Sequence, residues 1–344
     1  MQFLEVATSI GDRVSGPHVV PIDPREHHSV ELLVAAAQRM HRLFRENGVP
    51  QESIIVSIPA TEAGIRAVQI LEPQGILTNL YLVTSLVHAA LCVETKTAAV
   101  SVAVGPLLAI YEAKAKKIYD DLNKHPGIEN IRTILKYFEL NQIRTKVLGT
   151  AFRSLEEVGQ LSDCDAVCIT DIQADGLKWS PVPIPNADCE EGRRIELRAS
   201  QAKFPTDLLT RNSESVNSEK SNKLVGGGFE TWFSPESRSV TKAVLDTELH
   251  QLELQMKEIQ RYVETEIDRL AAFRATDTWT VGYRGGSPGL QWKAYRGEKS
   301  PVRTPTASPA SNSKLKKSYS STAHAEFLKR LKDTQGEQDM DDVF

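Results

Sequence analysis

Short apolar runs alternate with helix-like segments in the amino-terminal part of the chain. The apolar runs cover 53–58, 77–83 and 98–104, and the segments between them, 62–72 and 85–95, have the length of helices. Strands that alternate with helices in this way are typical of repeated βαβ units and a parallel sheet. The runs are almost wholly apolar, as expected of strands that are covered on both faces. The pattern predicts an α/β fold.

Three polar residues interrupt these apolar runs, one in each predicted strand. They are Ser57, Asn79 and Ser101. In a βα repeat that closes toward a barrel, polar side chains inside otherwise apolar strands point toward a shared interior, near the end where sites are built. We therefore expect these three side chains to lie together.

The alternation continues on both sides of this region. The predicted strands cover 18–23, 53–58, 77–83, 98–104, 145–150 and 166–170. The predicted helices cover 30–47, 62–72, 85–95, 108–124, 128–141, 154–162 and 236–272. Pro21 lies inside the first strand, which is compatible with a strand only at the edge of a sheet.

Five segments carry a resemblance to a known family. They are 56–61 (VSIPAT), 75–82 (GILTNLYL), 100–107 (VSVAVGPL), 148–153 (LGTAFR) and 164–169 (CDAVCI). Their order, spacing and apolar framework resemble those of the transaldolase family, whose members form a (β/α) barrel. The resemblance implies a TIM-type barrel, an ancestry in carbohydrate metabolism of the pentose phosphate type, and a sugar phosphate as ligand.

The resemblance also implies a chemistry whose residues are largely replaced here. The family uses a strand lysine that forms a Schiff base with a ketose, and the imine then acts as an electron sink. That position is Ser57, and serine forms no stable imine. The position of the family's carboxylate is occupied by Pro21, and that of a threonine that helps to hold the catalytic water by Tyr81. Pro106 stands in place of one phosphate-binding arginine, and Ala151 stands in place of a serine. We therefore identify no catalytic residue.

Three polar positions of the family pattern are retained, and they are our candidate substrate-binding residues. They are Asn79, Ser101 and Arg153. Arg153 comes just after a predicted strand, where barrels commonly bind phosphate. A purely structural role is the alternative for each: a local backbone hydrogen bond for Ser101, packing for Asn79, and a surface ion pair for Arg153.

No other lysine is well placed to replace the missing one. Lys96 and Lys146 precede their strands and so belong to the opposite end of the barrel, and Lys114, Lys116 and Lys117 belong to a helix predicted to be exposed.

The predicted architecture is an incomplete barrel with about six of the usual eight strands, because the first two βα units of the family have no counterpart. We expect one domain over 1–275, with a long loop at 180–228 and a carboxy-terminal helix at 236–272. Residues 276–344 are rich in Ser, Pro and Lys and are expected to be mostly disordered. The two open edges would need cover from residues 1–28, residues 186–228, a second copy of the chain or a protein partner.

Composition narrows the class of partner. The net charge of −4 over 344 residues gives no reason to expect binding to nucleic acid or to an anionic membrane. No apolar run approaches the ~20 residues of a membrane span, and the amino-terminal residues lack a signal pattern, so we expect a cytoplasmic protein. The four cysteines are expected to be free thiols in a reducing compartment, with no metal and no cofactor.

Three functions stay open at this point. The first is a transaldolase-like protein that lacks Schiff-base activity, a pseudoenzyme. The second is an active transferase or aldolase that moves a dihydroxyacetone unit between sugar phosphates, which would need a lysine in the interior. The third is a scaffold or interaction protein whose working parts are the 236–272 helix and the tail.

Overall fold

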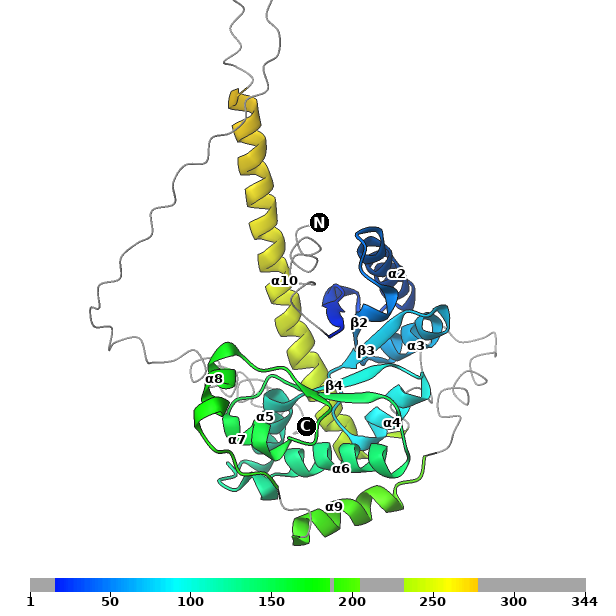
Figure 1. Ribbon diagram of the computed structural model, residues 1–344, viewed down its shortest axis with the longest axis vertical. Coiled ribbons are helices and arrows are strands. Elements are labelled where there is room, and N and C mark those ends of the chain that lie inside the picture. Colours follow the sequence, from blue (N-terminus) through cyan, green and yellow to red (C-terminus); the bar gives the residue numbers. More distant parts are fainter. Residues whose placement is uncertain (1–15, 186–188, 205–231, 278–344) are drawn as a thin grey trace, which may run out of the picture. The chain divides into compact units, whose positions relative to one another are not determined.

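The computed structural model describes residues 16–185, 189–204 and 232–277, and in residues 271–277 it describes the backbone alone. Six parallel strands form a single sheet (Figure 1). In chain order they are β1 (His18–Pro21), β2 (Ile54–Pro59), β3 (Leu77–Tyr81), β4 (Ala99–Ala103), β5 (Lys146–Thr150) and β6 (Ala166–Val167). Each strand pairs with the next one along the chain, so the spatial order is β1-β2-β3-β4-β5-β6. Consecutive strands are thus neighbours in the sheet and are joined through helices, which is the arrangement that the apolar pattern predicted.

Helices connect the strands and follow them along the chain. The α-helices are α2 (Val30–Glu46), α3 (Glu62–Leu71), α4 (Leu86–Glu94), α5 (Val104–Ala115), α6 (Pro126–Leu140), α7 (Leu155–Gln160), α8 (Asp171–Trp179), α9 (Glu190–Gln201) and α10 (Pro235–Asp277). Short 3-10 turns are η1 (Pro24–Glu26), η2 (Gln51–Ser53), η3 (Glu72–Gln74) and η4 (Leu122–Lys124). Ser and Thr hydroxyls begin several of these helices by accepting a backbone N–H, as Thr61 does from Gly64 in α3 and Ser154 from Glu157 in α7.

Two helices differ from the sequence prediction. Helix α5 begins at Val104 and ends at Ala115, because Lys116 adopts a left-handed conformation (φ 49°) that stops it, so the prediction of 108–124 was wrong. Helix α9 lies inside 180–228, which the sequence predicted as a loop. The remainder of that segment falls largely outside the described residues, as does the tail predicted at 276–344 beyond Asp277.

The sheet is open within the part of the chain that the structure describes. Strands β1 and β6 each pair with one neighbour, which confirms the incomplete barrel and leaves Pro21 on an edge strand. Strand β6 is shorter than the predicted 166–170, and both of its residues are exposed. Strand β6 pairs with β5 alone among the described strands, and the last hydrogen bond between them runs from Cys168 N to Gly149 O at 2.8 Å.

Helix α3 packs closely on β2 because a glycine lies at the contact. A Cβ atom at Gly64 would lie 1.9 Å from the carbonyl oxygen of Pro59, a separation that backbone atoms cannot accommodate. This close approach brings the amino end of α3 against the carboxyl end of β2.

The first half of α10 packs through its apolar face. Val240, Val244 and Leu249 are buried, as is Phe233 just before the helix, and the helix includes the predicted 236–272. The chain divides into two units at Lys257 and Glu258, inside this helix. In the second unit, α10 carries exposed apolar side chains, among them Ile259 and Tyr262. No described helix combines the length and the apolar character that a membrane crossing requires.

Candidate functional site

Ser57, Asn79 and Ser101 form a continuous chain of hydrogen bonds across β2, β3 and β4. The Asn79 amide nitrogen donates to the Ser57 hydroxyl oxygen at 2.9 Å, and the Ser101 hydroxyl donates to the Asn79 amide oxygen at 2.7 Å. Ser57 and Asn79 are register partners, so their side chains leave the sheet at the same level. All three residues are buried. The structure thus brings together the three polar strand residues, as the sequence predicted.

This polar row contains no amine, the group that Schiff-base chemistry on a carbonyl requires. Schiff-base chemistry needs a neutral amine, and here the corresponding atom is the Ser57 hydroxyl oxygen, which already accepts a hydrogen bond from Asn79. None of the described lysines forms a hydrogen bond with the row. Lys146 pairs with Asp165 at 2.7 Å, and Lys114 bonds to the Ser239 hydroxyl.

Replacing Asn79 by leucine is expected to lower the free energy of unfolding by about 2–3 kcal/mol, because the Ser57 and Ser101 hydroxyls both lose their partner in a buried place. Urea unfolding of the variant and the wild type measures this. Asn123→Leu is the control, since Asn123 is only partly buried and, among the described residues, its side chain bonds to Asp121 two positions earlier. A loss for Asn79→Leu no larger than for the control would show that the row contributes little to stability.

The positions that handle protons in the family hold no free acid here. Pro21 is the register partner of Ser57 and has no acidic group. Burial, together with the negative charge of Asp23, raises the pKa of the Tyr81 phenol, so it stays neutral. Asp23 itself accepts hydrogen bonds from Arg25, with oxygen–nitrogen distances of 2.5–3.0 Å, and these lower its pKa. Asp23 also caps η1, so its carboxylate has a structural task.

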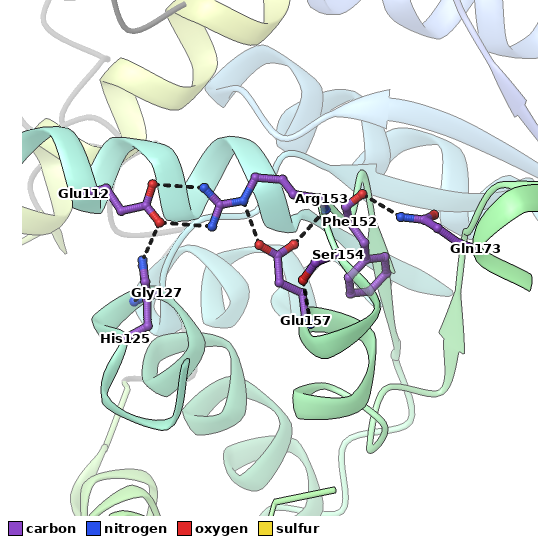
Figure 2. A network of polar contacts seen from close by, with 8 residues as sticks. All are labelled: Glu112, His125, Gly127, Phe152, Arg153, Ser154, Glu157 and Gln173. Atoms are coloured by element: carbon purple, nitrogen blue, oxygen red, sulfur yellow. Dashed lines mark hydrogen bonds and ion pairs between the residues drawn. The ribbon is translucent and has the colours of Figure 1, made fainter. Parts of the chain in front are cut away.

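Arg153 lies just after β5 and is held by two carboxylates (Figure 2). Its Nε donates to Glu157 at 2.6 Å, and its two terminal nitrogens donate to the two oxygens of Glu112 at 2.9 and 3.0 Å. The second oxygen of Glu157 accepts the Arg153 backbone N–H at 2.7 Å. Glu157 is 2% exposed and Glu112 12% exposed, so this bidentate pair is largely shielded from water.

A buried histidine completes this cluster. The Nδ1 of His125 accepts the Gly127 backbone N–H at 3.0 Å, so Nε2 carries the ring proton and faces Glu112 at 3.4 Å. Burial alone would raise the pKa of Glu112, but the contacts from His125 and Arg153 outweigh it and lower the pKa to about 2. Glu112 is therefore ionised at neutral pH, as its pairing with Arg153 requires.

The cluster determines what Arg153 can bind. One guanidinium charge faces two carboxylates, and a phosphate approaching it would compete with both of them. Sequence reasoning predicted Arg153 as a ligand residue and missed Glu112, Glu157 and His125. The S-L-E-E run at 154–157 carried a usable signal, because a glutamate three residues after a serine cap commonly reaches back toward the start of the helix.

No metal-binding group was found in the part of the chain that the structure describes, where no three His, Cys, Asp or Glu side chains gather in a suitable cluster. The cysteines Cys92, Cys164, Cys168 and Cys189 are all free.

Comparisons with known proteins agree with the resemblance read from the sequence. The profile of the family "Transaldolase/Fructose-6-phosphate aldolase" matches residues 2–214, which is well over half of the chain. A probable transaldolase of Dictyostelium discoideum is 28% identical over 206 residues, 60% of this chain and 61% of that protein. A transaldolase of Prochlorococcus marinus (strain MIT 9211) is 28% identical over 254 residues, 72% of this chain and 69% of that protein.

A third relative is matched over a shorter region. A transaldolase of Prochlorococcus marinus (strain MIT 9301) is 33% identical over 156 residues, 45% of this chain and 47% of that protein. The chain thus spans between about half and two thirds of the length of these relatives. The family profile, the six parallel strands in chain order and the polar interior row agree, and this chain belongs to the transaldolase/fructose-6-phosphate aldolase family.

Proposed function

We propose that this protein is a transaldolase-family member without Schiff-base activity. The observation that carries the proposal is the position of Ser57. It lies on the strand where the family pattern has its lysine, it is buried, and it is bonded to Asn79. A hydroxyl in this position cannot supply the electron sink on which carbon–carbon cleavage depends.

The replaced proton-transfer positions support the same proposal. A general acid–base step needs a group near the reacting atom whose pKa lies near the working pH. Pro21 has no such group, Tyr81 has a raised pKa, and Asp23 is an ionised carboxylate bound to Arg25. Restoring an amine alone would therefore not restore the reaction.

The arginine cluster supports the proposal from the substrate side. The substrates of the transaldolase family carry phosphate groups, and binding a phosphate requires a cationic side chain that is free to pair with it. Arg153 is bound to Glu112 and Glu157 and is proposed to have a structural role. Ligand binding by Asn79 and Ser101 stays a prediction, since their polar atoms already bond to one another.

An active transferase that moves a dihydroxyacetone unit between sugar phosphates is less well supported. Losing the nucleophile of a site that acts as a unit costs on the order of 10⁶ in rate in a well-studied enzyme. That factor corresponds to ~8 kcal/mol of activation free energy. The described lysines offer no replacement, because Lys146 and Lys114 are bonded elsewhere.

The Ser57→Lys variant tests the proposal by restoring only the nucleophile. We expect it to form a borohydride-trapped adduct with fructose 6-phosphate but to transfer no three-carbon unit at a measurable rate, since the proton-transfer positions remain replaced. Intact mass and a coupled transfer assay measure the two steps separately. Ser57→Met, which has similar bulk without an amine, is the control. Rapid turnover by Ser57→Lys would contradict the loss of the proton-transfer positions, because the remaining machinery would then be complete. An adduct on the wild type would contradict the proposal itself.

A scaffold or interaction protein is the second candidate, and one observation favours it. In the second unit, α10 exposes Ile259, Tyr262, Ile267 and Leu270, with Val263 half-buried. Ile259, Val263, Ile267 and Leu270 recur at intervals of four, four and three residues, close to the spacing of helices that pair with another helix. We propose that the partner is a second copy of the chain or another protein, which packs on this face or on the open edges of the sheet. A cytoplasmic location stays a prediction.

A further inference from the structure

A cavity lies at the end of the sheet opposite to Arg153. It has a volume of about 560 Å³ and lies between α6, α9 and the residues that begin β5. Its lining includes Arg132 and Lys136 from α6, Thr145 and Lys146 at the start of β5, and Ile195 and Glu196 from α9. Neither the family pattern nor the polar row at Ser57 involves any of these residues. The volume is large enough for a small metabolite.

Arg132 is a buried cation that lines this cavity without a partner. The residue is 8% exposed, and its Nη1 is fully covered with no hydrogen-bond acceptor. Within residues 16–185, 189–204 and 232–277, no hydrogen bond or ion pair involves its guanidinium. Burying a charge without a counter-ion is strongly unfavourable, and native proteins rarely retain one for structural reasons.

The other charges around the cavity do not neutralise Arg132, because they are already paired or exposed. Lys136 pairs with Glu139 at 3.1 Å, and Lys146 pairs with Asp165 at 2.7 Å. Glu196 is exposed to solvent. Asp163, which also lines the cavity, is likewise exposed to solvent, where its charge is screened. Arg132 is therefore the one buried charged residue among those that line the cavity.

The neighbouring arginines show that acceptors exist nearby and are used by others. Arg194 and Arg198 of α9 both reach Glu129 of α6, at 2.8 and 3.5 Å. These pairs hold α9 against α6. Arg132, on the same helix as Glu129, makes no such pair and lines the cavity beneath α9 instead.

We propose that this cavity binds a small ligand through an oxyanion, a carboxylate or a phosphate, that pairs with the Arg132 guanidinium. A guanidinium offers two parallel N–H donors, which fit both of these anions in a bidentate manner. The bound anion would supply the hydrogen-bond partner that the Arg132 guanidinium lacks among the described residues. The site is separate from the barrel interior, so it does not depend on whether Schiff-base chemistry has been lost.

Thermal unfolding of the full chain tests this site, with inorganic phosphate and succinate as the two probes and chloride as the ionic-strength control. We expect at least one probe to raise the Tm of the wild type by roughly 3 °C or more near saturation. The probe that acts identifies the preferred anion. Equilibrium dialysis with the same probe should show at least tenfold weaker binding to Arg132→Met than to the wild type.

The variants separate binding from a general effect on folding. Without added anion, Arg132→Met should unfold at or above the Tm of the wild type, because it removes an uncompensated buried charge. Arg132→Lys keeps the charge but loses the two-pronged geometry, so it should bind more weakly than the wild type. Arg39→Met, at an exposed arginine of α2, is the matched control and should respond like the wild type. No Tm shift with either probe, or an equal shift in Arg132→Met, would overturn the proposal.

Discussion

Replacing Arg153 by alanine is expected to lower the free energy of unfolding by about 3–5 kcal/mol, the cost of removing one partner from a buried ion pair. The substitution leaves Glu157 and Glu112 without their cation in places where water reaches them poorly. Without Arg153 the pKa of Glu112 should also rise, since the guanidinium is one of the groups that lower it.

Urea unfolding at neutral pH measures this effect, and Arg66→Ala provides the matched control. Arg66 pairs with Glu62 at 2.7 Å on the surface of α3, where both side chains are more than 40% exposed. Such exposed pairs contribute ~0–1 kcal/mol. If Arg153→Ala cost no more than Arg66→Ala, the cluster would not be structural, and Arg153 would again be a candidate for phosphate binding.

Lowering the pH toward about 4 is expected to destabilise the protein by up to about 3 kcal/mol through His88 alone. Burial lowers the pKa of His88 to about 4, from an ordinary value near 6.5, although its hydrogen bond to Ala60 O acts in the opposite direction. Between these two pH values the unfolded chain binds a proton that the folded chain excludes. Stability is therefore complete above about pH 6.5 and is lost progressively as the pH falls.

The contacts of His88 explain why its neutral form is required. Nε2 lies 2.7 Å from the Ala60 carbonyl oxygen and must donate to it, so Nδ1 accepts from the Thr84 hydroxyl at 3.2 Å. Thr84 in turn lies 2.6 Å from the Thr241 hydroxyl of α10. A proton on Nδ1 would break this sequence of contacts, which lies within the first unit and joins α4 to the first half of α10.

Urea unfolding between about pH 4.5 and 7 checks the prediction, with His88→Gln as the comparison. The titration of Glu112 falls mainly below this range, because its pKa is near 2. The free energy of unfolding of the variant should depend less steeply on pH than that of the wild type. At the steepest point, the difference in slope should correspond to the uptake of about one proton on unfolding. Identical slopes would mean that His88 does not carry the pH dependence.

The sequence predicted the strands better than the ends of the helices. The apolar runs identified all six strands. The central strands β2, β3 and β4 are largely buried, as expected of strands that are covered on both faces. Strand β6 was predicted too long, since its pairing depends on what lies beside it in space. Helix α9 was missed because its polar composition resembles a loop, and its fit against α6 depends on Ile195 and Ala199 alone as buried apolar contacts.

The polar row and the arginine cluster differ in how far they could be foreseen. Ser57, Asn79 and Ser101 stood out because polar residues are rare in apolar strands. The partner of Arg153 on α5 could not be foreseen, since Glu112 lies 41 residues earlier in the chain. Nothing in the sequence showed that Arg132 would be buried without a partner, because helical spacing does not reveal which acceptors a neighbouring helix supplies.

Borohydride trapping of the purified wild-type protein with fructose 6-phosphate, read by intact mass, tests the central claim most directly. The account predicts no ketose adduct on the wild type, whereas Ser57→Lys, treated in parallel, should be modified. A stoichiometric adduct on the wild type would contradict the account, because it would prove an imine-forming lysine, and peptide mapping would then locate it.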